Sequence, residues 1–550
     1  METTNVTASK PSSTSLKHGA ETHQSSTWPI FWAVWCSFFL YGAIAAPVPA
    51  VNEPHYLCKA RHFWQPGWCD QDFFLHSANA HTVFYATVGS LTTFLSLDQA
   101  AWIGRALAIL VLAAGWCRLL STVTTSRCSP LYVCWLFLLL AAIGSFSGEW
   151  LVGGVEGKTF AYGFLFSALG HAIRGRIIRA GALAGLAVAF HPVIGVWGCL
   201  AYAGAELVRR RLWQVNRLKS AFSAAKIREG LVSMVAFAVC ALPGLIPVFH
   251  LLTESVPKST KNAATFIQVY YRLAHHLDPM RFLQRAYAEY AVLLIVWLFL
   301  ITFRRWRRRG GNSAPTVSIP QDDPAANQWR FDLIVGFALL FAVGGLVIGW
   351  GPRPAQGMTW YLQRAQLLKF YPFRLADVLI PLAVSIGVVN AVATRGGRRA
   401  IVSGAYGLMF VAALFRAHSV VEVNRYSGEF RADWIDACRW IDKHLPAEAL
   451  IHTPHNGWAF KWFAQRAEYV AFKDCPQDAA GIVEWNRRLN YLKRWFDSHY
   501  EDQFYSAEEL RAFRAETHIT HIFTDRLGPM GIEPVFKNES FQVYDLTLLD

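Results

Sequence analysis

The chain has 550 residues, of which 53% are hydrophobic and 16% are charged, and its mean hydropathy is +0.24. This composition is typical of a protein that crosses a membrane many times, and it excludes an ordinary water-soluble fold. The formal net charge is +14. Because the basic residues lie in short clusters between apolar segments, as the positive-inside rule predicts, we expect no nucleic-acid partner.

The first segment, residues 1–27, is polar and rich in Ser and Thr, and it lacks the small-residue cleavage pattern of a secretory signal. We expect a disordered cytoplasmic tail there. The apolar segment that follows is then an uncleaved membrane anchor.

About eleven segments are apolar and long enough to count as membrane spans. In this count residues 179–208 form two short helices that are broken at His191 and Pro192, because proline ends or kinks a helix. Four basic clusters then fall on one side of the membrane, at 174–179, 209–219, 304–309 and 395–399. The predicted spans are 28–48, 100–120, 130–147, 157–173, 179–191, 193–208, 228–250, 286–303, 331–350, 374–393 and 399–416.

Residues 80–97 are also apolar, but Gly89 and four Thr interrupt them. We expect this stretch to lie on the outer surface as an interfacial helix, because a span here would place later basic clusters outside. The loop 52–99 is then wholly extracytoplasmic. The transmembrane domain covers 28–424, the N-terminus is inside, and residues 425–550 form an external domain.

The tail alternates helical patterns at 432–445, 478–497 and 506–516 with strand-like runs. These runs are ALIHT at 449–453, YVAF at 469–472, THIFT at 520–524 and FQVYDL at 541–546. The alternation predicts a small α/β domain. No glycine-rich phosphate loop or nucleophile elbow occurs in it.

Four cysteines lie outside the membrane in this topology, and they are candidates for two disulfides in an oxidising compartment. A bridge between Cys58 and Cys69 would close part of the first loop, whereas buried reduced thiols are the alternative. The other two are Cys438 and Cys475.

The first external loop concentrates polar chemistry, in NEPHYLCKARHFWQPGWCDQDFFLHSANAH at residues 52–81. Asp70 and Asp72, with nearby histidines such as His55, are candidates to hold a divalent metal or to orient a substrate. No compact metal-binding spacing such as HExxH is present, so a surface turn with interfacial histidines is the alternative. No other cofactor is expected.

The layout of residues 28–420 resembles the GT-C superfamily of membrane glycosyltransferases, which includes protein O-mannosyltransferases and aminoarabinose transferases. The first span leads into a long external loop that opens with NEPHYL, and the next span is entered through WIGRALAILVLAAGWCRLL. GALAGLAVAFHPVIGVW is similar to the paired short helices of these enzymes. The resemblance implies an all-α GT-C-like fold and a lipid-linked sugar donor.

The resemblance also implies a catalytic acid at the start of the first external loop, a position that Glu53 occupies. Several relatives begin this loop with Asp-Glu, whereas this chain has Asn52 before Glu53. Without the resemblance, Glu53 is a solvated acid at a helix end. The chain, through NEPHYL, HPVIGVW and its tail, is also similar to a group of uncharacterised bacterial membrane proteins, which gives no activity.

Two other external loops carry charges that suit a substrate phosphate. Residues 351–374 contain four basic residues and no acid, and Arg364, Lys369 and Arg374 are candidate phosphate ligands. Anchoring to anionic lipids is the alternative for that stretch. Glu156 and Lys158, near Glu149, face the same external space in this topology.

The leading hypothesis is a multi-pass transferase of the plasma membrane, the inner membrane in a bacterium. It moves a sugar from a polyprenyl-phosphate donor to an extracytoplasmic acceptor, with Glu53 as general base. Its expected partners are membrane lipid, the donor and an unidentified acceptor. The alternatives are a transporter or flippase for a lipid or polar solute, and a noncatalytic envelope scaffold.

Overall fold

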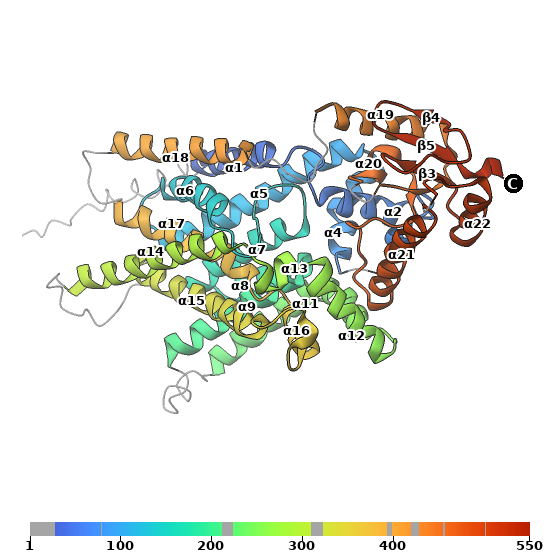
Figure 1. Ribbon diagram of the computed structural model, residues 1–550. Coiled ribbons are helices and arrows are strands. Elements are labelled where there is room, and N and C mark those ends of the chain that lie inside the picture. Colours follow the sequence, from blue (N-terminus) through green and yellow to red (C-terminus); the bar gives the residue numbers. More distant parts are fainter. Residues whose placement is uncertain are drawn as a thin grey trace, which may run out of the picture.

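The structure of the protein, a computed structural model, describes residues 28–78, 80–211, 224–309, 323–392, 399–419, 428–454, 457–500 and 502–549. The expected cytoplasmic tail at 1–27 lies outside the described residues, as do parts of the basic clusters at 209–219 and 395–399. Figure 1 shows a helical bundle with a smaller domain at one end, which is drawn in orange and red.

Each predicted span coincides with a helix of the bundle. Seven helices among the described residues are long and apolar enough to cross a membrane. The other four predicted spans coincide with α6, α7 and α8, which have 15, 17 and 14 residues, and with α9, which carries charges at its end. The bundle comprises α1 Trp28–Ala45, α5 Leu97–Val123, α6 Ser129–Ile143, α7 Gly157–Ile173, α8 Ile177–Phe190, α9 Pro192–Arg210, α11 Ala224–Leu252, α14 Gln284–Arg309, α15 Pro324–Gly349, α17 Arg374–Val392 and α18 Arg399–Ser419.

Small residues let the central helices approach closely. Helices α5 and α7 meet at Gly115 and Gly163, where a Cβ on Gly115 would lie 2.0 Å from the carbonyl oxygen of Gly163. Backbone contact of this kind is a common way for membrane helices to associate, because dispersion forces replace the hydrophobic effect in lipid. The close packing of α5 against α7 holds α7 in position, including its first turn with Lys158.

The first external loop folds into short helices instead of another span. These are η1 Pro54–Cys58, α2 Lys59–Trp64, α3 Phe73–His76, α4 Thr82–Ala86 and η2 Val88–Thr93. They lie between the bundle and the smaller domain (Figure 1). Further short helices cover the same end of the bundle, namely α12 Lys258–Phe266, η3 Ile267–Arg272, α13 Ala274–Leu277, η4 Pro279–Arg281, η5 Ala355–Gly357 and α16 Tyr361–Leu368.

The C-terminal domain has the predicted α/β architecture. Its five-stranded sheet has the order β2-β1-β3-β5-β4, in which β1 is parallel to β2 and β3, and β5 is antiparallel to β3 and β4. The strand expected at 469–472 lies earlier and is only two residues long. The elements are α19 Gly428–His444, β1 Leu450–His452, α20 Phe460–Ala464, β2 Ala467–Glu468, α21 Ala479–Ser498, α22 Ala507–Thr517, β3 His521–Thr524, β4 Phe536–Lys537, β5 Gln542–Asp545 and η7 Leu546–Leu549.

A buried charge cluster joins this domain to the first external loop. The Lys461 ammonium lies 2.6 Å from Glu468, 2.7 Å from Asp474 and 3.1 Å from Asp72. Asp72 also accepts the backbone N–H of Leu75, which caps α3, and the backbone N–H of Glu468. A buried charge that loses its partners is strongly destabilising. This cluster therefore favours one docked arrangement of the first external loop and the C-terminal domain.

The four cysteines proposed for disulfides are all free thiols. Cys58 and Cys69 lie in one apolar cluster and Cys438 in another. Burial raises the pKa of all of these thiols, and also that of Cys475 to about 12, so the protonated form predominates. The structure therefore has free thiols, the alternative to disulfides, at all four positions, and three of the four are buried.

The charge cluster predicts a large effect of Lys461→Met on stability. This substitution leaves three carboxylates in a buried site without their cation, which costs about 3–5 kcal/mol of unfolding free energy. We expect a clear fall in melting temperature of the purified protein, followed by tryptophan fluorescence in detergent. Lys493→Met removes an exposed ion pair with Asp497 and should leave the melting temperature unchanged. Equal melting of the two variants would contradict the role of the cluster.

Candidate functional site

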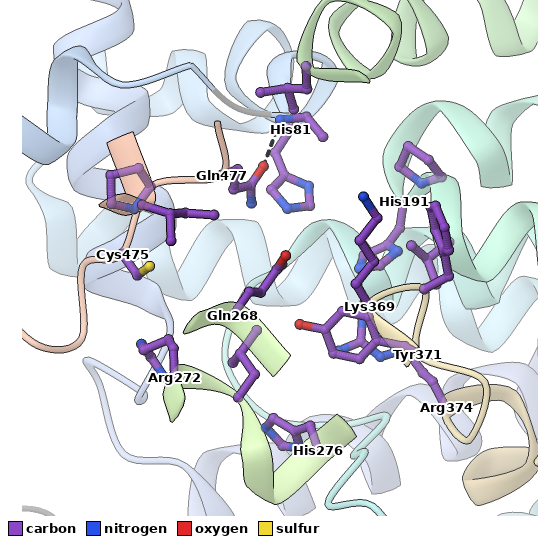
Figure 2. A pocket seen from close by; sticks show the side chains of 18 of the residues that line it. His81, His191, Gln268, Arg272, His276, Lys369, Tyr371, Arg374, Cys475 and Gln477 are labelled. Carbon is purple, nitrogen blue, oxygen red and sulfur yellow. Dashed lines mark hydrogen bonds between the residues drawn. The ribbon is translucent and has the colours of Figure 1, made fainter. Parts of the chain in front are cut away.

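A cavity of about 440 Å³ lies where the bundle, the first external loop and the C-terminal domain meet. Figure 2 shows that its side chains come from all three parts, including His81 of the first loop, Arg374 of the bundle and Gln477 of the C-terminal domain. The backbone N–H of Ala80 donates to the Gln477 side chain across this junction. The cavity therefore depends on the docking of the C-terminal domain.

Two buried glutamates and two cations form a continuous chain along one wall. Arg374 Nε lies 2.9 Å from Glu149 Oε2, and Lys158 Nζ lies 3.9 Å from Glu149 Oε1 and 3.4 Å from Glu156 Oε2. The side-chain N–H of Asn52 donates to Glu156 Oε1 over 2.8 Å. Burial raises the pKa of Glu156, although Lys158 opposes this effect. A carboxylate with a raised pKa can exchange a proton near neutral pH.

Histidines extend this wall. His191 lies at the break between α8 and α9, where it caps α9 and its Nε2 lies 3.1 Å from Arg374 Nη1. His81 lies beside it, 3.3 Å from the Tyr56 hydroxyl. Burial, more than the neighbouring positive charges, lowers the pKa of His81 to about 3, so this imidazole is neutral.

The cavity has more positive than negative groups. Lys369 has no carboxylate partner among the described residues, and burial and the charge of Lys261 both lower its pKa. Of the acids, Glu254 is occupied, because it accepts the backbone N–H groups of Ala479 and Ala480. This excess suits an anionic ligand such as a phosphate. The lining cations are Lys158, Lys261, Arg272, Lys369, Arg374 and Lys473, and the lining acids are Glu149, Glu156 and Glu254.

One side of the cavity is apolar. Val248, Leu251 and Leu252 near the end of α11 line it, together with Pro192 and Val193 of α9. Most of α11 is exposed on the outside of the bundle, and its sequence is strongly apolar. In a membrane this surface faces lipid, so the polar cavity adjoins a hydrocarbon-facing wall.

The structure brings together five of the residues selected from the sequence. All of them line the cavity: His55, Glu156, Lys158, Lys369 and Arg374. His55 is 3.2 Å from Asp474 of the charge cluster, and burial lowers its pKa. Sequence reasoning placed these residues on separate external loops, and their shared cavity supports the expectation that the loops converge.

Glu53 does not line the cavity, so the structure places it apart from the other candidate residues, and its role as general base stays a prediction from the sequence. Its side chain is fully buried, and Arg105 pairs with both carboxylate oxygens over 2.6 Å. The same oxygens accept the backbone N–H groups of Ala50 and Val155. This carboxylate therefore has four hydrogen-bond donors, and it is not among the residues that line the cavity. Glu53 is a structural counter-ion.

Three other selected residues also lie away from the cavity. Asp70 is exposed and contacts His76, and Asp72 belongs to the Lys461 cluster. Arg364 donates to the carbonyl oxygens of Ile348 and Trp350 at the end of α15. The two aspartates are therefore placed for local structure and not for catalysis, and Arg364 is not placed to bind a phosphate in the cavity.

The described residues contain no group of three or more His, Cys, Asp or Glu side chains arranged to hold a metal ion. Asp70 and Asp72 contact different partners, and a divalent metal stays a prediction from the sequence. The chemistry considered below uses only side chains of the cavity.

Sequence reasoning missed several cavity residues. Arg272 lies in η3, in a segment without a distinctive motif, and His276 follows it in α13. Gln477 comes from the C-terminal domain. Lys473, in the same segment, could be an acceptor contact or a surface charge by its sequence, and the surface charge was the favoured interpretation; it lines the cavity. The only signal in the sequence is the lack of a local acid partner for Arg272, which is too common to identify a site.

One protein-family model matches the chain, a domain of unknown function (DUF6798), over residues 432–492. This segment runs from α19 into α21, and it includes Lys461 and the stretch that lines the cavity. No curated protein matches the chain.

Three solved structures are similar to the chain at 11–12% sequence identity. The archaeal oligosaccharyltransferase AglB from Archaeoglobus fulgidus, in complex with an inhibitory peptide and a dolichol-phosphate, has a TM-score of 0.38 over 90% of this chain and 69% of that one. The oligosaccharyltransferase of the same organism with Zn and sulfate scores 0.41 over 90% and 68%. ArnT from Cupriavidus metallidurans bound to undecaprenyl phosphate scores 0.40 over 94% and 98%. Because each score is below 0.5, the functional assignment rests on the cavity itself.

The Glu53–Arg105 pair predicts that Glu53→Gln destabilises the protein. The substitution leaves a buried guanidinium without its counter-ion, which costs about 3–5 kcal/mol. We expect a lower melting temperature and a lower folded yield. Adding Arg105→Met to Glu53→Gln removes the unpaired charge and should recover part of the loss. A Glu53→Gln protein that melts like the wild type would show that the pair is not structural.

Proposed function

We propose that the protein is a membrane glycosyltransferase of the GT-C type, which transfers a sugar from a polyprenyl-phosphate donor to a hydroxyl acceptor outside the cytoplasm. One observation carries the proposal: a cavity with two buried glutamates and an excess of cations opens beside the apolar wall of α11. A lipid-linked phosphate needs this combination, because its chain stays in hydrocarbon while its head group enters a polar site.

The arrangement of the bundle supports an external position for the cavity. Helix α7 begins at the cavity and ends at Ile173, whose carbonyl oxygen accepts an N–H of Arg330 near the start of α15. At that far end Arg304 pairs with Asp332, and the basic end of α9 is nearby through Glu206. The positive-inside rule places this basic end in the cytoplasm. The cavity and the C-terminal domain are then extracytoplasmic.

The proposed reaction uses Glu156 as the general base. Glu156 takes the proton of the acceptor hydroxyl, whose oxygen attacks the anomeric carbon of the donor sugar. The bond from that carbon to the phosphate oxygen breaks, and the polyprenyl phosphate leaves with the electron pair. Glu149 is less suited to be the base, because a guanidinium lies 2.9 Å from it. The closest partner of Glu156, by contrast, is the neutral amide of Asn52, and its cation Lys158 is 3.4 Å away.

The leaving phosphate is assigned to Lys369 and Arg374. Arg374 is held between Glu149 and His191 and lies over the Tyr371 ring, with its charge centre 4.1 Å from the ring centroid. These contacts orient the guanidinium before a substrate binds, so it can stabilise developing charge without reorganising. Lys158 lies between the two glutamates, 3.9 Å from Glu149 and 3.4 Å from Glu156, so its charge opposes the effect of burial on Glu156.

The base assignment predicts that Glu156→Gln lowers kcat by roughly 100-fold or more, because general base catalysis is worth at least that factor. The measurement is transfer from a panel of labelled polyprenyl-phosphate sugars by protein in nanodiscs. Asp70→Asn is the matched control, since Asp70 is exposed and distant from the cavity, and it should retain wild-type turnover. Full turnover by Glu156→Gln would remove Glu156 from the mechanism.

The raised pKa of Glu156 predicts a defined pH dependence. The base must be ionised, so kcat/KM falls as the pH decreases through the pKa of Glu156. The midpoint should lie above the ordinary glutamate value of about 4.3. The residual activity of Glu156→Gln should lack this acid limb. An acid limb that remains at the same midpoint in that variant would assign it to another group.

A further inference from the structure

The cations of the cavity lie on two opposite walls. Figure 2 shows Lys369, Tyr371 and Arg374 on one side and Arg272 with Cys475 on the other, with Gln268 between them. The first wall is the one assigned to the donor phosphate. The second wall is formed by η3 and by the segment of the C-terminal domain that begins at Lys473, and the donor does not account for its charge.

Arg272 is held in place but is not neutralised. Its Nη2 donates to the carbonyl oxygen of Lys473 over 2.8 Å, and its guanidinium lies 5.2 Å from the centroid of the Phe472 ring. Its buried Nε has no hydrogen-bond partner, and no carboxylate pairs with it among the described residues. A buried donor without a partner is costly unless a ligand supplies one.

Two acids near this wall are occupied elsewhere. Asp474, next to Lys473, contacts Lys461 through one oxygen and His55 through the other. Glu254 accepts two backbone N–H groups of α21. The positive charge of this wall affects a neighbouring histidine. Burial, and after it the charges of Arg272 and Lys473, lower the pKa of His275.

We propose that Arg272 and Lys473 bind an oxyanion on the acceptor, so that the acceptor is an anionic hydroxyl compound. This inference rests on the proposed transferase function. An arginine that no carboxylate neutralises can bind a carboxylate or a phosphate, and the nearby lysine adds a second positive charge. Arg272 lies across the cavity from Lys369 and Arg374 (Figure 2), so the acceptor and the donor phosphate occupy separate sites. The C-terminal domain thus selects the acceptor through its charge.

The test compares three small probes that share a hydroxyl framework: glycerol, glycerate and glycerol 3-phosphate. Binding to the protein in nanodiscs of uncharged-headgroup lipid is measured by calorimetry at low salt. We expect at least one anionic probe to bind about tenfold or more tightly than glycerol, as hydrogen bonds to charged groups allow. The tighter of the two anions identifies the oxyanion as carboxylate or phosphate. Equal binding of all three probes would overturn the proposal.

Variants locate the site. Lys473→Gln and Arg272→Gln should each remove most of the preference for the anionic probe, whereas Lys493→Gln, on the exposed face of α21, should leave it unchanged. Lys473→Gln keeps the test valid if Arg272→Gln does not fold, because the Arg272 contact uses the backbone of Lys473. A wild-type preference in Lys473→Gln, or an equal loss in Lys493→Gln, would exclude this site.

Binding and transfer can fail separately. Glu156→Gln should bind the anionic probe like the wild type while losing transfer. If the anion binds at Arg272 but no donor supports transfer, the transferase function is wrong and the anion site remains. Suppose instead that the protein transfers sugar to neutral and anionic acceptors with equal efficiency, and that Arg272→Gln leaves the KM for the anionic acceptor unchanged. The transferase function then remains, and the proposed anion site is wrong.

Discussion

The buried ion pair between Glu53 and Arg105 determines how the polar wall of the cavity is assembled. It connects the end of α1, the loop before α7 and the start of α5, through hydrogen bonds to Ala50, Val155 and Ala46. Close packing helps, since a Cβ on Gly154 would lie 2.9 Å from Glu53 Cγ. Asn52 precedes Glu53 in the sequence, and Glu156 follows Val155. The ion pair therefore brings Asn52 and Glu156 together in the cavity, where their side chains are 2.8 Å apart. A pair outside the cavity thus positions the proposed base.

The docking of the C-terminal domain depends in a comparable way on one buried cation, Lys461. Lys461 satisfies three carboxylates from two parts of the chain, and one of them, Asp474, contacts His55 at the cavity. The residues that follow Asp474 form a wall of the site. Since a buried charge is stable only with its partners in place, the docked position of the domain and the shape of the cavity are coupled. The domain is therefore part of the site.

Much of the fold follows from local sequence patterns. Apolar segments and the break at Pro192 predict the bundle helices, and alternation in the tail predicts the sheet, because both patterns depend on neighbours in sequence. The role of Glu53 could not be predicted in this way. Its partner Arg105 is 52 residues away, and a carboxylate at a loop start has the same sequence signature whether it faces a cavity or an arginine. The ion pair of Asp72 with Lys461 could not be predicted for the same reason, since it joins distant segments of the chain.

The central claim is that the cavity binds the phosphate of a membrane-embedded donor. The most direct measurement is an electron cryomicroscopy structure of the protein in nanodiscs with a polyprenyl phosphate. The account predicts phosphate density beside Lys369 and Arg374, with the chain leaving along Leu251 and Leu252 of α11. Density at the basic far end of the bundle, or a lipid phosphate that makes no contact with these two cations, would contradict it.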